Sequence, residues 1–205
     1  MKQPARPRML ILGLTGSIGM GKSTAAAILR ARGFPVYSAD DAVHALLKKG
    51  GKAVKPVARL LPTSLKRGAI DRKHLGLAVF DQPRKLRQLE KILHPLIRRT
   101  ERAFLAKARK DKARAAILEI PLLYETGGEK RCDYTFCVTA PRALQRARVL
   151  ARPNMTPAKF KAILARQMPD AEKRKYADFI IPTGKGLAAT AHHLDKALRA
   201  INLLP

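Results

Sequence analysis

Cysteine and tryptophan are scarce in this sequence. Its 205 residues include two cysteines, Cys132 and Cys137, and no tryptophan. Two cysteines four residues apart, with no further cysteine and no paired histidine, do not make the ligand set of a zinc site. Scarce cysteine is typical of proteins from reducing compartments, so we expect a cytoplasmic location. Four tyrosines and six phenylalanines leave little aromatic surface on which nucleic-acid bases can stack.

Long apolar runs are also missing. No run approaches the roughly 18 residues that a membrane-spanning helix needs. The apolar residues 9–14 follow a basic N-terminus, but this run is too short for a signal peptide and leads directly into a glycine-rich loop. We therefore expect no membrane partner.

Acidic residues are few. The chain has 15 Asp and Glu against 42 Lys and Arg, which gives a formal net charge of +27. Such a charge attracts anions, among them nucleic acids, anionic lipids and phosphorylated metabolites. The basic residues are spread along the chain and form no basic tail. A phosphate-rich substrate accounts for part of the charge, and a solvated basic surface is the simplest interpretation of the rest.

Short apolar runs alternate with helical patterns along most of the chain. The runs at 9–14, 35–37, 115–120, 134–138 and 179–181 predict strands. Helices are expected at 23–32, 41–49, 141–150, 156–167 and 187–203. This alternation is typical of α/β proteins, so we predict a parallel five-stranded sheet with helices on both faces.

A longer, mostly helical stretch at 52–110 separates the second and third predicted strands. Leu and Ile recur between 86 and 97 at spacings of three and four, as on one face of an amphipathic helix. Pro95 lies inside this pattern and is expected to kink or break the helix. His94 beside it is a lone histidine, for which the ordinary interpretation is a packed, hydrogen-bonded side chain.

Residues 16–23, GSIGMGKS, match the phosphate-binding pattern GxxxxGK[ST]. The loop follows a predicted strand and precedes a predicted helix, as the pattern requires. Its glycines allow backbone N–H groups to turn toward phosphate oxygens, and the helix directs its positive end at the anion. Lys22 can reach the outer phosphates, Ser23 can ligate Mg²⁺, and Thr24 can add a donor near the inner phosphate. The predicted nucleotide-binding residues are Gly16, Gly19, Met20, Gly21, Lys22, Ser23 and Thr24, with ATP and Mg²⁺ as the expected cofactors.

Two carboxylates follow predicted strands. Asp40 comes after the second strand and Glu119 ends the third. Ligands of parallel sheets bind beyond the carboxyl ends of the strands, so we expect both residues on the same rim as the phosphate loop. Asp40 can accept the proton of an attacking hydroxyl, as a kinase requires, or it can simply cap a helix that begins at 41. Glu119 can hold Mg²⁺, or it can be an ordinary charge at the end of a strand.

Gln145, Arg148 and Arg152 recur at spacings of three and four, which places them on one helix face. Arginines on a mobile flap can stabilise the charge of a phosphoryl group in transfer, and a closing flap excludes water. A solvated basic helix face is the alternative interpretation.

The motifs in their order along the chain resemble those of the dephospho-CoA kinase family, which has the P-loop NTPase fold. They are GLTGSIGMGKST (13–24), VYSAD (36–40), AIDRKHLGLAVF (69–80), LEKILHPLI (89–97), LEIPLLYETG (118–127), QRARVLAR (145–152) and ADFIIPTG (177–184).

This resemblance implies transfer of the ATP γ-phosphate to the ribose 3′-hydroxyl of dephospho-CoA, the last step of coenzyme A synthesis. It also implies three parts. The nucleotide-binding core would comprise 1–40, 114–141 and 169–205, the helical CoA-binding insertion 41–113, and the lid 142–168. ATP and dephospho-CoA are the expected partners, a monomer is expected, and no specific nucleic acid is expected.

The resemblance also assigns roles to single residues. Asp40 matches the family's proposed catalytic base, and Arg148 and Arg152 match its lid arginines. His94 and Pro95 match a motif of its substrate-side domain. The sequence departs from the common family pattern at three positions, where Ser38 and Glu119 replace aspartates and Thr183 stands near a usual asparagine.

Two other functions are compatible with the residues alone. The first is a P-loop kinase of another small acceptor, such as a nucleotide, although the large stretch at 41–113 is unlike a short nucleotide-monophosphate lid. The second is an ATP-dependent nucleic-acid-binding protein, which the net charge favours and the few aromatic residues disfavour.

Overall fold

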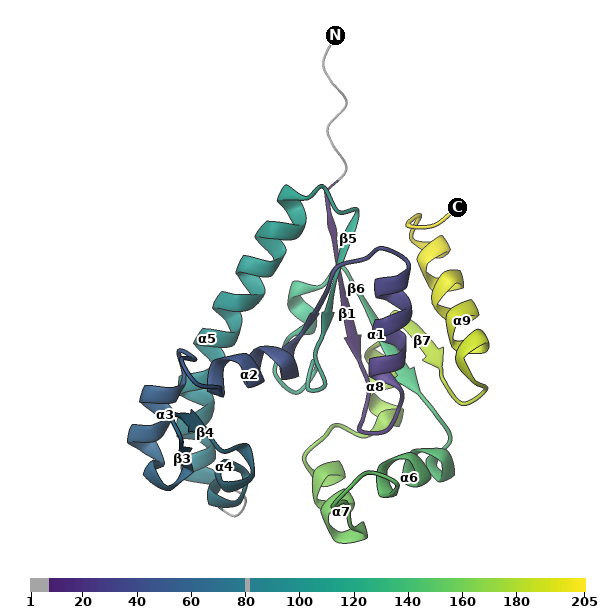
Figure 1. Cartoon of the computed structure of the whole chain (residues 1–205). Helices are drawn as coiled ribbons and strands as arrows, with labels where there is room; N and C mark the ends of the chain where they lie inside the picture. The colour runs from purple at the N-terminus through teal and green to yellow at the C-terminus, as the bar shows by residue number, and fades with distance from the viewer. Residues whose placement is uncertain (1–7, 80–81) are drawn as a thin grey trace. The chain divides into compact units, whose positions relative to one another are not determined.

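The structure, a computed structural model, describes residues 8–79 and 82–205 (Figure 1). It divides into two compact units, one formed by the chain up to Tyr37 together with Ala108–Pro205, the other by Ser38–Lys107. Residues 1–7 of the predicted core and Phe80, the last residue of the motif at 69–80, lie outside the described residues.

The first unit is built on a parallel five-stranded sheet, which confirms the predicted α/β class. The strand order is β2 (Val36–Ser38), β5 (Ala115–Glu119), β1 (Leu10–Thr15), β6 (Tyr134–Thr139) and β7 (Phe179–Pro182). The central strand β1 pairs in parallel with β5 and β6, and β6 pairs in parallel with β7. The loop that leaves β1 therefore starts from the middle of the carboxyl edge of the sheet, where α/β proteins bind ligands.

The helices of the first unit follow the strands as expected, with one addition. They are α1 (Lys22–Ala31), α6 (Arg142–Leu150), α7 (Pro157–Ala165), α8 (Asp170–Tyr176) and α9 (Leu187–Ala200), with a short 3₁₀ turn, η2, at Glu129–Arg131. The helix α8 was not expected from the sequence, because its seven mostly charged residues show no apolar periodicity. Among the described residues, the helices include none with the length and apolar content to cross a membrane.

One face of the sheet carries the main apolar core, where α1 and α9 pack against each other and against the strands (Figure 1). Leu12 and Leu14 of β1 are fully buried in it, together with Leu194 and Leu198 of α9. Because successive strand residues point to opposite faces, Gly13 faces the other side. An added Cβ there would lie 2.8 Å from Leu123 and 2.9 Å from the sulfur of Cys132, so this position has room for glycine alone.

The second unit is largely helical, as the sequence predicted for this stretch. It contains α2 (Ala39–Leu47), α3 (Val54–Leu60), η1 (Pro62–Ser64), α4 (Arg72–Val79) and most of α5 (Pro83–Lys110). A small hairpin of β3 (Leu65–Lys66) and β4 (Ala69–Ile70) lies among the helices. Its turn places Arg67 and Gly68 at positive φ. The unit has its own apolar core, formed by Leu46, Leu47, Ala53, Val57, Leu61, Ile70, Leu75, Val79, Leu89 and Leu93.

Two local expectations in this unit were wrong. Asp40 does not cap α2, because the helix begins at Ala39, two residues earlier than expected, and Ser38 is its N-cap, with its Oγ accepting a hydrogen bond from the Asp41 N–H at 3.2 Å. Pro95 does not break the predicted helix, since α5 continues through it to Lys110. A proline removes one N–H donor, while the buried face that includes Leu89 and Leu93 supports the rest of the helix.

Candidate functional site

The phosphate loop joins β1 to α1 through three glycines with positive φ. The values are 148° at Gly16, 77° at Gly19 and 89° at Gly21, a backbone region that side chains with a Cβ rarely adopt. The space around these glycines is also full. An added Cβ would lie 2.6 Å from the carbonyl oxygen of Val138 at Gly16 and 2.5 Å from a methyl carbon of Val149 at Gly19. The glycines are therefore required both by the loop's shape and by its close packing.

The amino end of α1 is open to an anion. Its N-cap is Gly21, no side chain caps the helix, and its first turn contains no acidic residue. The first N–H groups of a helix lack partners within the helix, and the helix dipole places positive charge at this end. Lys22, the first residue of α1, donates from Nζ to the Gly16 carbonyl at 2.9 Å. Its ammonium group therefore lies over the loop that would surround the phosphates.

The predicted metal-binding residues lie at the same edge of the sheet. Ser23, the predicted hydroxyl ligand, is exposed in the first turn of α1, as is Thr24, which is predicted to bind near the inner phosphate. Glu119 is the last residue of β5 and is in register with Leu14 of β1, next to the start of the loop. Hydroxyl and carboxylate oxygens are the donors that Mg²⁺ prefers, so the types of the residues present fit this ion.

Met20 takes part in the loop through its backbone. Its side chain is 2% exposed and belongs to the main apolar core, and its sulfur accepts a hydrogen bond from the Ala140 N–H at 3.1 Å. The Met20 N–H points back into the loop and donates to the Ser17 carbonyl at 3.2 Å. Because the side chain is buried in the core, we expect Met20 to contact a nucleotide through its peptide group.

Two glutamine side chains hold the peptide groups of Ile18. The Ile18 N–H donates to Oε1 of Gln167 at 3.0 Å, and Nε2 of Gln145 donates to the Ile18 carbonyl at 2.8 Å. Gln145 lies on α6 and is 5% exposed, while Gln167 lies between α7 and α8. Both backbone groups of one loop residue are therefore bound by side chains that are more than 120 residues away in the sequence.

Arg148 of α6 is also tied to the loop, through Thr183. Its guanidinium donates to the Thr183 hydroxyl at 3.2 Å and to the Thr183 carbonyl at 2.9 Å. The Thr183 hydroxyl donates to the Met20 carbonyl at 2.8 Å, and an added Cβ at Gly21 would meet this hydroxyl at 2.8 Å. Arg152 lies two residues beyond the end of α6 and is exposed. Arg148 thus has fixed partners, and Arg152 projects from a turn.

The predicted base and substrate-side residues lie in the second unit. Asp40 is exposed in the first turn of α2, and His94 and Pro95 are exposed on α5. Exposure means that His94 is not the packed core histidine that the ordinary interpretation suggested. These three residues and the phosphate loop belong to different units. Their proximity to ATP therefore stays a prediction.

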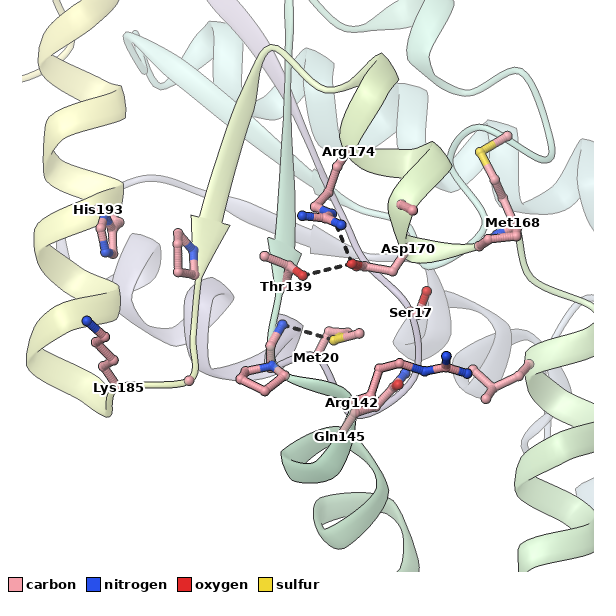
Figure 2. Close-up of a pocket in the computed structure, with 17 residues that line it drawn as sticks. Ser17, Met20, Thr139, Arg142, Gln145, Met168, Asp170, Arg174, Lys185 and His193 are labelled. Carbon is pink, nitrogen blue, oxygen red and sulfur yellow. Dashed lines mark hydrogen bonds and ion pairs between the residues drawn. The ribbon is translucent and has the colours of Figure 1, made fainter.

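A cavity of about 940 Å³ borders the loop within the first unit (Figure 2). Ser17 and Met20 of the loop line it, together with Gln145. Figure 2 shows Asp170 between two partners: its Oδ2 accepts a hydrogen bond from the Thr139 hydroxyl at 2.9 Å and forms an ion pair with Nε of Arg174 at 3.2 Å. These contacts join β6 to α8 beside the loop.

Cys137 of β6 and Tyr124, in the segment after β5, have shifted pKa values. Burial raises the pKa of the Cys137 thiol to about 12, and burial likewise raises the pKa of the Tyr124 phenol to about 12. Burial therefore favours the neutral form of both groups near pH 7. Cys137 is buried and Cys132 partly buried, and both are free thiols.

Sequence reasoning missed several residues that shape the site. Gln167 and Lys173 gave no signal, because neither belongs to a chemical motif. Lys173 is fully buried and donates to the Pro121 carbonyl and to Glu125. Thr183 was singled out only as a departure from a family pattern, and Gln145 only as part of a helix face. Periodicity could identify the buried side of α6 but not the backbone group that Gln145 binds.

Comparison with known proteins identifies what this arrangement resembles. A family model described as dephospho-CoA kinase matches residues 10–188. The relative named dephospho-CoA kinase from Paramagnetospirillum magneticum is 57% identical over 166 residues, which cover 81% of this chain and 78% of the relative.

Solved structures agree with the sequence comparison. The crystal structure of TT1252 from Thermus thermophilus is similar with a TM-score of 0.85 and 36% identity, covering 95% of this chain and 98% of the other. The structure named dephospho-CoA kinase from Campylobacter jejuni has a TM-score of 0.68 and 30% identity, covering 93% of this chain and 96% of the other.

Proposed function

The chain belongs to the dephospho-CoA kinase family, and we propose the residue roles by which it transfers the γ-phosphoryl group of ATP to the ribose 3′-hydroxyl of dephospho-CoA. The activity is that of an ATP-dependent kinase at the last step of coenzyme A synthesis. This conclusion rests on the family match over residues 10–188. The matched range contains the phosphate loop and every residue that is assigned a role below.

The phosphate loop binds the triphosphate of ATP. Its backbone N–H groups and the open amino end of α1 surround the phosphates, and Lys22 exchanges the Gly16 carbonyl for the outer phosphates. Ser23 is the residue that would hold Mg²⁺, with Glu119 as a ligand of the ion or of its waters, and Thr24 binds near the inner phosphate. When bound, Mg²⁺ offsets charge on the β- and γ-phosphates.

Asp40 acts as the base toward the acceptor. As the 3′-oxygen bonds to the γ-phosphorus, the bond from that phosphorus to the bridging oxygen of ADP breaks, and the proton of the hydroxyl passes to the Asp40 carboxylate. Asp40 suits this role because it is exposed and because Ser38 supplies the helix cap in its place. His94 and Pro95 lie on the substrate side, in a 41–113 insertion that binds dephospho-CoA.

The two arginines act at the nucleotide, Arg152 on the transferred group and Arg148 beside the phosphate loop. Arg152 closes over the γ-phosphoryl group as part of a lid at 142–168, which adds positive charge where charge develops in the transition state. Arg148 is held by Thr183 beside the loop, so its role is on the nucleotide side. We propose further that the protein acts as a monomer in the cytoplasm.

Replacing Asp40 tests the proposed base. Asp40→Asn removes the proton acceptor but keeps the size of the side chain, so kcat should fall by a factor of about 10²–10⁴, while the dissociation constant for ATP stays within about twofold. Steady-state kinetics with dephospho-CoA and equilibrium binding of ATP measure the two quantities.

Asp41→Asn is the matched control, because Asp41 is the exposed neighbour on the same turn. It should keep the wild-type kcat. Wild-type turnover in Asp40→Asn would remove Asp40 from the base role and leave the family activity untouched.

A further inference from the structure

The side chains of Gln145 and Gln167 bind the two backbone groups of Ile18. Ile18 lies in the middle of the phosphate loop, between Gly16 and Gly19. A glycine-rich loop loses more conformational entropy on ordering than other segments. Contacts that fix its peptide groups therefore reduce the entropic cost of holding the N–H groups in their anion-binding arrangement.

The chemistry of the two contacts is complementary. A peptide N–H requires an acceptor and a peptide carbonyl requires a donor, and a glutamine amide supplies one of each. Gln167 uses its oxygen on the N–H and Gln145 uses its nitrogen on the carbonyl, so the peptide groups on both sides of Ile18 are held against rotation. Gln145 is 5% exposed, which shields its bond from competing water.

The packing around the two glutamines restricts them in turn. α6 lies directly against the loop, since an added Cβ at Gly19 would meet the Gln145 carbonyl oxygen at 3.0 Å. Next to Gln167, the Met168 N–H donates to Oε1 of Glu125 at 2.8 Å. Glu125 in turn binds the fully buried Lys173. Neither glutamine is thus a surface side chain that happens to reach the loop.

We propose that Gln145 and Gln167 are positioning residues that hold the phosphate loop in its ATP-binding shape through the peptide groups of Ile18. The inference rests on the proposed function, because it concerns the ATP site of the same reaction. It predicts that the two side chains affect the affinity for ATP far more than the affinity for dephospho-CoA, whose proposed contacts lie in another unit.

The kinetic test replaces each glutamine with methionine, which has a similar length and no amide. Gln145→Met and Gln167→Met should each raise KM for ATP about tenfold and change KM for dephospho-CoA by less than about twofold. Lys196→Met is the matched control, because it introduces the same side chain at an exposed position of α9, and it should leave both KM values unchanged.

A second test follows hydrogen exchange of the Ile18 amide by NMR. Gln167→Met should speed exchange of this amide at least tenfold, whereas Gln167→Glu should keep it protected, because a carboxylate retains the acceptor. Gln145→Glu should raise KM for ATP like Gln145→Met, since it loses the donor. The variants Gln145→Glu and Gln167→Glu keep the proposal testable if a methionine variant does not fold.

The results that overturn the proposal differ from those that overturn the function. KM for ATP within twofold of wild type in both methionine variants would contradict the positioning role, as would equal increases in both KM values with a lower melting temperature. A wild-type protein that forms no product from ATP and dephospho-CoA would instead contradict the function, while the exchange test on Ile18 would still decide the role of Gln167.

Discussion

At the residue scale, the phosphate loop is held by side chains that lie outside it in the sequence and bind its peptide groups. The pattern GxxxxGK[ST] identified the phosphate loop, and the positive φ values at Gly16, Gly19 and Gly21 give the physical reason for its glycines. The residues that hold the loop from outside, Gln145, Gln167 and Thr183, bind backbone groups. Backbone groups are the same at every position, so no residue pattern could predict which of them each side chain binds.

Thr183 gives a residue-scale prediction. Thr183→Val keeps the shape of the side chain but leaves the Met20 carbonyl without its 2.8 Å donor and Arg148 without one of its acceptors. An unsatisfied buried group costs about 1–3 kcal/mol, so chemical denaturation should show a loss of stability in this range, together with a higher KM for ATP. Thr126→Val is the control, since Thr126 is exposed and bonds within its own turn. Unchanged stability in Thr183→Val would show that the hydroxyl does not support the loop.

At the element scale, the strands were predicted well because each parallel strand is a short, buried apolar run between loop residues. The structure confirms all five, with shifts of at most one residue at their ends. The elements missed were α8 and the β3–β4 hairpin. The hairpin strands have two residues each, too few for any period to appear, and α8 is held by the buried contacts of Lys173, which no sequence period predicts.

Lys173 gives the element-scale prediction. Its ammonium group is fully buried and donates to Glu125 and to the Pro121 carbonyl, which joins α8 to the segment after β5. Glu125→Gln leaves a buried charge without its counter-charge, so the free energy of unfolding should fall by about 3–5 kcal/mol. Lys173→Met, which removes the charge itself, should cost less. Urea unfolding of both variants measures this, and a larger loss in Lys173→Met than in Glu125→Gln would contradict the account of the pair.

At the scale of the whole molecule, the sequence identified an inserted helical stretch, and the structure divides into two compact units. The assignment of 41–113 to CoA binding and of 142–168 to a lid stays a prediction, as do the roles of Asp40, His94 and Pro95. These roles concern bound substrates, and neither a residue pattern nor the packing within one unit defines where a substrate binds.

The net charge of +27 gives a prediction at this scale. Non-specific binding to DNA is expected at low salt, and its affinity should fall by orders of magnitude between about 50 and 200 mM salt, because it depends on counterion release. Fluorescence anisotropy with a labelled duplex measures the affinity, and DNA should not stimulate ADP release. Salt-independent binding, or ADP release that depends on DNA, would favour a nucleic-acid function.

The central claim is that this chain phosphorylates dephospho-CoA with ATP. The direct measurement is ADP release by the purified protein with ATP and Mg²⁺ at moderate salt, with and without dephospho-CoA, and with the product identified by mass spectrometry. We expect ADP release that depends on dephospho-CoA and yields coenzyme A in equal amount. A folded protein that binds ATP but releases no additional ADP when dephospho-CoA is added would contradict it.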